Sequence, residues 1–124
     1  MAGQWMAAAL LAAGLMGTAV EARTQDDRRI AKLAAEAESQ EQHTRVADAY
    51  RDRAELLEAE AAREARKARR LEAAWFPHEH KLPPMQRPGY RERQRAASAR
   101  TEAREARVLA QKHTQIATDL RNAP

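Results

Sequence analysis

The chain has 124 residues, enough for one small domain, with 32% charged residues and a net charge of +4. Most of its hydrophobic residues are alanines and only 4% of its residues are aromatic, which excludes a large apolar core and a sheet-based enzyme fold. It contains no cysteine, so disulfides, thiolate metal sites and lipid-modified cysteines are excluded as well. This composition predicts an all-α protein.

Residues 1–22 have the features of a signal peptide, with an apolar run over residues 6–16 followed by small residues. Val20 and Ala22 favour cleavage after Ala22, and cleavage after Ala19 is the alternative. The run is shorter than the roughly 20 residues that span a bilayer, but no Lys or Arg precedes it. We therefore expect a periplasmic or secreted protein that contacts a membrane only if this segment stays uncleaved.

Residues 23–38 predict a short N-terminal helix, because Thr24 and the acidic residues after it suit a helix start. Its apolar stripe is too narrow to hold the helix by itself. The stripe consists of Ile30, Leu33, Ala34 and Ala37.

A long helix is predicted over about residues 40–75, which contain no Gly or Pro. Ser39 and Gln42 have the spacing of a capping box at its start, although a helix continuous with the preceding one breaks no steric rule. Pro77 ends it, because a residue before proline is disfavoured in the α region. Apolar positions recur at threes and fours, at Val46, Ala47, Tyr50, Ala54, Leu57, Ala61, Ala65, Ala68, Leu71 and Trp75.

A second long helix is predicted over about residues 90–121, with a heptad seam built on alanine. Its seam positions are Ala96, Ala99, Ala103, Ala106, Ala110, His113, Ala117 and Leu120. Two helices of similar length joined by a proline-rich turn at 76–89 predict an antiparallel hairpin over 39–124. Alanines bury little area, so at about 25 cal/mol per Å² the interface is thin. We expect the short helix to pack on it or two hairpins to pair into a four-helix bundle.

The turn gathers large apolar side chains that are scarce elsewhere in the chain. They form either a small core that caps the hairpin tip or an exposed patch for a partner. These candidate partner-binding residues are Trp75, Phe76, Leu82, Met85 and Tyr90.

Histidines supply the candidate metal ligands. His78 and His80, with Met85 nearby, offer imidazole and thioether groups to copper or zinc, or are simply solvated in the turn. His43 and His113 lie on the ends that an antiparallel hairpin brings to one side. A turn symmetric about Trp75 and Tyr90 leaves them nine residues out of register, about 13 Å by helix rise, which is too far for shared ligation.

No catalytic signature occurs: nucleophile elbow, phosphate-binding glycine loop, HExxH, EF-hand and kinase motifs are all missing from the sequence. The carboxylates alternate with arginines at the spacing of exposed helices, so we expect no catalytic residue. Basic residues near the end of the first long helix suit the helix dipole, or else bind an anionic envelope polymer; nucleic acid is not favoured. The helix-dipole interpretation concerns Arg66, Lys67, Arg69 and Arg70, and the polymer interpretation concerns Arg63, Arg66, Arg69 and Arg70.

Two pieces of sequence flank the turn, Ala106-Arg107-Val108-Leu109-Ala110-x-x-His113-x-x-Ile116-Ala117 and His43-x-x-Val46-Ala47-x-x-Tyr50. With the signal peptide and the Pro/Met-containing turn, they resemble small exported alanine-rich helical-hairpin proteins of Gram-negative bacteria. The resemblance covers residues 39–120. Such proteins often carry a His-Cys pair after the turn, where this chain has Pro88 and Gly89. The resemblance implies export and a helical hairpin but no activity.

The predicted function is that of a non-enzymatic exported structural or interaction protein, which self-associates or binds a protein partner through alanine seams and the aromatic turn. It needs no cofactor. The alternative is a periplasmic accessory protein that binds copper or zinc.

Overall fold

The computed structural model describes residues 25–76 and 81–124, and within those ranges the chain is helical with no strand. It divides into two compact units, residues 1–37 and 38–124, which are described separately. The predicted signal peptide and the turn residues His78 and His80 lie outside the described residues. No helix in the described part is both long and apolar enough to cross a membrane.

The first unit contains a helix over residues 25–36. Ile30 and Ala34 are half-buried, whereas Leu33 is 42% exposed. Residues 37–39 are not helical, so this helix and the next one are separate elements.

Helix α2 (Gln40–Trp75) begins with the predicted capping box. The Ser39 hydroxyl accepts a hydrogen bond from the Gln42 amide at 3.2 Å, and the Gln42 side-chain oxygen accepts one from the Ser39 amide at 3.1 Å. The helix ends where Phe76 becomes extended, at φ −62° and ψ 135°. This is the conformation that a residue before proline favours.

After α2, the second unit contains the short 3₁₀ helix η2 (Pro84–Gln86) and helix α3 (Tyr90–Asn122). Gly89 precedes α3 in a left-handed conformation, with φ +86°. A Cβ atom there would lie 3.0 Å from the carbonyl oxygen of Ala68 on α2. Glycine therefore allows both the sharp entry into α3 and its close approach to α2.

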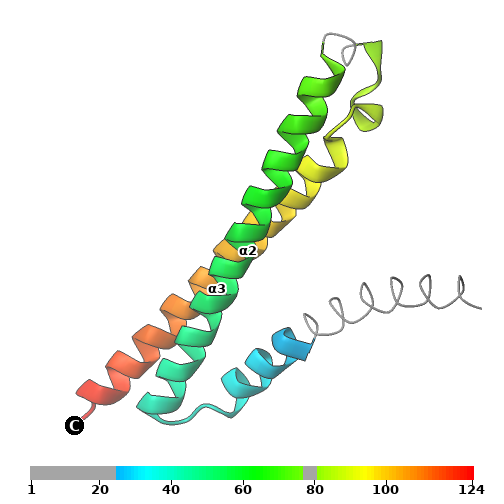
Figure 1. Cartoon of the computed structure of the whole chain (residues 1–124). Helices are drawn as coiled ribbons and strands as arrows, with labels where there is room; N and C mark the ends of the chain where they lie inside the picture. Colours follow the sequence, from blue (N-terminus) through cyan, green and yellow to red (C-terminus); the bar gives the residue numbers. More distant parts are fainter. Residues whose placement is uncertain (1–24, 77–80) are drawn as a thin grey trace, which may run out of the picture. The chain divides into compact units, whose positions relative to one another are not determined.

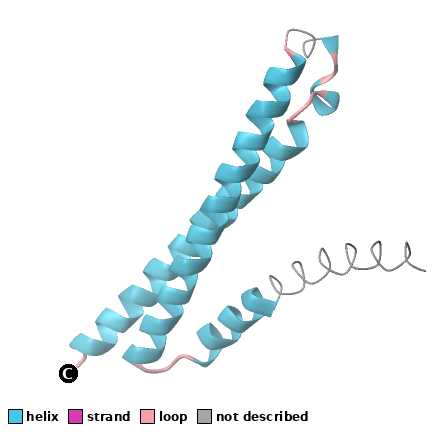
Figure 2. Cartoon of the chain, in the orientation of Figure 1, coloured by secondary structure: helices cyan, strands magenta, loops and turns pink. Residues whose placement is uncertain are grey.

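Helices α2 and α3 run side by side in opposite directions, and the chain's C-terminus lies near the start of α2 (Figures 1 and 2). The predicted all-α antiparallel hairpin is thus confirmed. Val46 and Leu57 are its largest fully buried side chains, and the rest of the seam is mostly alanine. The buried alanines repeat at intervals of seven on each helix: Ala47, Ala54, Ala61 and Ala68 on α2, and Ala96, Ala103, Ala110 and Ala117 on α3.

The predicted register of the hairpin is wrong. Gly89 packs against Ala68, so α2 extends seven residues beyond the point where α3 begins beside it. The turn is therefore not symmetric about Trp75 and Tyr90. The shift of about two helical turns offsets the nine-residue mismatch expected for His43 and His113, and it places those side chains in contact rather than about 13 Å apart.

Candidate functional site

At the open end of the hairpin, two buried histidines meet across the seam. The Nδ1 atoms of His43 and His113 are 2.9 Å apart, and the residues are 8% and 7% exposed. The ring centroids are 5.2 Å apart. This distance exceeds the separation of the two Nδ1 atoms by about the width of one imidazole ring, so both nitrogens lie close to the line that joins the centroids. The rings therefore meet edge to edge, with one N–H donating to the other nitrogen.

The surroundings of His113 favour its neutral form. Burial lowers the pKa of His113 from its usual value of 6.5, and the neighbouring charges of His43 and Lys112 lower it further. The ring of Tyr50 lies nearly parallel to it, with centroids 5.9 Å apart. A neutral His113 can serve as the acceptor that the hydrogen bond requires.

Of the predicted metal ligands in the described part of the chain, His43 and His113 come together, whereas Met85 lies apart from them in the turn. Over residues 25–76 and 81–124, no group of three or more His, Cys, Asp or Glu residues is placed to hold a metal ion. The lone pair of one histidine of the His43–His113 pair is directed at the N–H of the other. Met85 lies in the turn and is 75% exposed.

At the other end, three of the five large apolar side chains at the turn are exposed. Trp75 is 51% exposed and Phe76 is 72% exposed, while Leu82 and Tyr90 are half-buried. Of the five candidate partner-binding residues, three are therefore exposed and two are half-buried. The basic residues predicted to contact an anionic polymer, Arg63, Arg66, Arg69 and Arg70, are likewise exposed on α2.

A hollow of about 360 Å³ lies beside Tyr90 at this end of the hairpin. Arg93 reaches across it from α3 and donates to Glu72, with Nη2 and Oε2 2.6 Å apart. This hydrogen bond lowers the pKa of Glu72. The hollow is lined by Glu72, Pro84, Arg87, Pro88, Tyr90 and Arg93.

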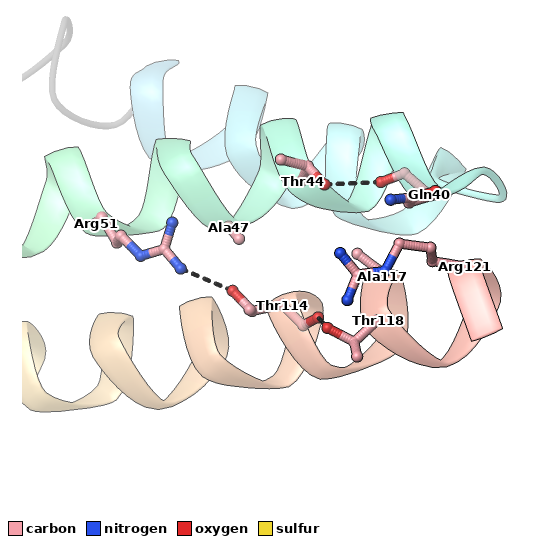
Figure 3. A pocket seen from close by; sticks show the side chains of 8 residues that line it. All are labelled: Gln40, Thr44, Ala47, Arg51, Thr114, Ala117, Thr118 and Arg121. Atoms are coloured by element: carbon pink, nitrogen blue, oxygen red, sulfur yellow. Dashed lines mark hydrogen bonds between the residues drawn. The ribbon is translucent and has the colours of Figure 1, made fainter.

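A second hollow, of about 200 Å³, lies at the open end between α2 and α3 (Figure 3). We call it the open-end groove. Ala47 and Ala117 are buried residues in it, and their small side chains leave the space open. Its other lining residues are Gln40, Thr44 and Arg51 from α2 and Thr114, Thr118 and Arg121 from α3.

The polar groups of the open-end groove are partly engaged. Arg51 donates to the Thr114 hydroxyl and to the Asp48 carboxylate, both at 2.8 Å. The hydroxyls of Thr44, Thr114 and Thr118 each donate to a backbone carbonyl four residues earlier, at 2.9–3.0 Å. Each hydroxyl oxygen therefore keeps acceptor capacity, while the guanidinium groups supply donors.

Sequence analysis did not identify the open-end groove, because its residues are adjacent only in the observed register. Without that register, its threonines and arginines look like ordinary exposed helix residues. The chain matched no protein-family model, no curated protein and no solved structure.

Proposed function

We propose that this chain is a non-enzymatic exported interaction protein that self-associates through the tip of its hairpin. The contact surface, called here the aromatic tip, consists of Trp75, Phe76, Leu82, Met85 and Tyr90. The observation that carries the proposal is the 51%, 72% and 75% exposure of Trp75, Phe76 and Met85. Export rests on the signal-peptide features of residues 1–22.

Most alanines of the seams are buried between α2 and α3, so the proposal rests on the aromatic tip. The aromatic tip holds much of the large apolar surface that remains. A gathered apolar surface of this kind marks a protein contact. A second copy of the chain is the simplest occupant, since a two-fold axis would place each aromatic tip against its equal.

The test is the mass of the protein in solution, measured by light scattering over a range of concentrations. The protein is purified from the cells that export it, and its N-terminus is sequenced to locate the cleavage site. We expect a dimer, and a monomer of unchanged helicity for the double variant Trp75→Ala and Phe76→Ala. A wild-type protein that stays monomeric would refute self-association, and lost helicity in the variant would mean that the tip is a structural cap.

The matched control removes similarly exposed apolar side chains from the middle of the hairpin. Leu56 and Val108 are 64% and 63% exposed, and neither belongs to the aromatic tip. The double variant Leu56→Ala and Val108→Ala should remain a dimer. If it dissociates as readily as the tip variant, the interface lies along the helices instead.

The second candidate function is binding of copper or zinc as a periplasmic accessory protein. The exposed thioether of Met85 favours it, because this soft ligand is accessible in the same turn that carries His78 and His80. Calorimetric titration with each metal tests this proposal. Submicromolar binding that disappears in the variant His78→Ala and His80→Ala would support it, and the absence of binding would reject it.

A further inference from the structure

One edge of the hairpin carries ion pairs between the helices. Arg107 donates to Glu58 through two hydrogen bonds of 2.7 and 2.8 Å, and Arg93 pairs with Glu72 fourteen residues away on each helix. In both layers, an arginine of α3 faces a glutamate of α2. The layer between them places Arg100 opposite Ala65 by the same register.

At the open end, two consecutive layers of this edge lack the carboxylate. Seven residues beyond Glu58 and Arg107, Arg51 meets Thr114, as their 2.8 Å hydrogen bond shows. Seven residues further, the register brings Thr44 opposite Arg121. Each of these layers thus pairs an arginine with a threonine, whereas a glutamate faces the arginine in two of the other three layers, at Glu58 and Glu72.

The two arginines of these layers share the open-end groove. Figure 3 shows the guanidinium of Arg51 reaching toward Thr114 from one end, and the side chain of Arg121 extending into the groove from the other. None of the groove's lining residues is acidic. Arg51 keeps its bond to Asp48 on its own helix, whereas Arg121 makes no ion pair or hydrogen bond within the described residues.

We propose that the open-end groove binds a compact dianion with a charge at each end, of the short dicarboxylate class. Its two carboxylates would take the positions that glutamates occupy elsewhere along this edge, one on Arg51 and one on Arg121. Charge-assisted hydrogen bonds of this kind are among the strongest that arginine makes. The volume of about 200 Å³ is below the roughly 300 Å³ at which drug-sized sites begin, and it suits a ligand of few atoms.

The threonine oxygens add a preference. Because their hydroxyl protons already bond to backbone carbonyls, Thr44 and Thr118 present acceptors to the ligand. A hydroxyl group on the dicarboxylate can donate to them. This site lies at the opposite end of the hairpin from the aromatic tip, so it stands or falls independently of self-association.

The test is a titration of the whole protein with succinate, followed by calorimetry and by NMR amide shifts at constant ionic strength. We expect saturable binding of one succinate per chain, with shifts confined to residues 40–51 and 114–121. Acetate, with one charge, should bind at least tenfold more weakly. Non-saturating succinate binding, or shifts spread over arginines along the whole hairpin, would overturn the proposal.

Three variants sharpen the result. Arg121→Gln should weaken succinate binding roughly tenfold or more, the effect of losing a hydrogen bond between charged groups. Thr44→Glu places a carboxylate opposite Arg121 in the register of Glu58 and Arg107, so it should abolish binding and raise the melting temperature. The control Arg107→Gln removes a similar charge outside the groove and should leave the affinity unchanged.

Circular dichroism verifies that each variant is folded. If Thr44→Glu keeps the wild-type affinity, or if Arg107→Gln loses as much affinity as Arg121→Gln, succinate senses only the overall positive charge and the groove is not a site.

Discussion

The two ends of the hairpin differ in which side chains they bury. At the tip, Trp75 and Phe76 are exposed, whereas at the open end His43 and His113 are buried. Folded proteins usually show the reverse, with large apolar side chains inside and imidazoles at intermediate exposure. A thin alanine seam has no deep core that could take up the largest side chains. The register of the two helices therefore decides which side chains are buried between them.

The same register separates the functions proposed for the two ends. The aromatic tip exposes apolar side chains to a second copy of the chain. The open-end groove presents the guanidinium groups of Arg51 and Arg121 to an anion. Changing the register would alter both ends at once, whereas changing one end should leave the other intact.

Gly89→Ala should have the largest effect on stability. The left-handed conformation costs a residue with a Cβ atom about 1–2 kcal/mol, and here the Cβ would also lie 3.0 Å from the Ala68 oxygen. We expect a loss of roughly 2–3 kcal/mol in denaturant unfolding. Gln86→Ala, an exposed change in the same turn, should stay within about 0.5 kcal/mol of wild type. Equal stability of the two variants would show that α3 does not approach α2 at Gly89.

His43→Ala should come second, because it leaves His113 buried without its hydrogen-bond partner. The expected loss is about 1–2 kcal/mol in the free energy of unfolding. The double variant His43→Leu and His113→Ala should recover stability, because it copies the layer of Leu57 and Ala99 two heptads away, where both residues are buried. A double variant less stable than His43→Ala would contradict this layer equivalence.

Acidification should destabilise the open end more than the tip. The pKa of His113 is lower in the folded hairpin than in the unfolded chain, so the unfolded chain binds more protons at mildly acid pH. The contribution of His113 to stability is complete above about pH 6.5 and declines as the pH falls through its folded-state pKa. Amide hydrogen exchange at several pH values measures this, after correction for intrinsic rates. The double variant at positions 43 and 113 should lose the effect, and a pH response that survives in it would assign the effect to other groups.

Arg107→Gln should have the smallest effect on the free energy of unfolding, because its ion pair with Glu58 is exposed and screened by solvent. The Arg107 hydrogen bond lowers the pKa of Glu58, so the contribution of the pair to stability is complete above pH 4.5 and is lost as the pH falls through the lower folded-state pKa. Thermal melts at pH 7 and pH 3 should therefore differ less between variant and wild type at the lower pH. A larger difference at pH 3 would contradict this assignment.

Much of the fold follows from local sequence signals. The capping box of Ser39 and Gln42, the extended Phe76 before Pro77, and the buried alanine repeat were all predictable from spacing and steric rules. These signals act within a few residues along the chain. They determine where the helices begin and end and which faces are apolar.

The register, the histidine pair and the open-end groove were not predictable in the same way. Where α3 meets α2 depends on the path of the turn and on the contact between Gly89 and Ala68, which are distant in sequence. Without that contact, the pairing of His43 with His113 and the shared groove of Arg51 and Arg121 have no local signal. The exposure of Trp75 and Phe76 likewise required the structure, because the sequence allowed both a cap and a patch.

The contact between the two buried histidines tests the register of the hairpin directly, because the same register positions the residues at both ends. NMR of the protein labelled in its four histidines can detect cross-relaxation between ring protons of different residues. We expect a cross-peak between His43 and His113 that disappears in the variant His43→Leu and His113→Ala. A folded hairpin without that cross-peak, with His43 instead beside residues about nine positions from His113, would contradict this register.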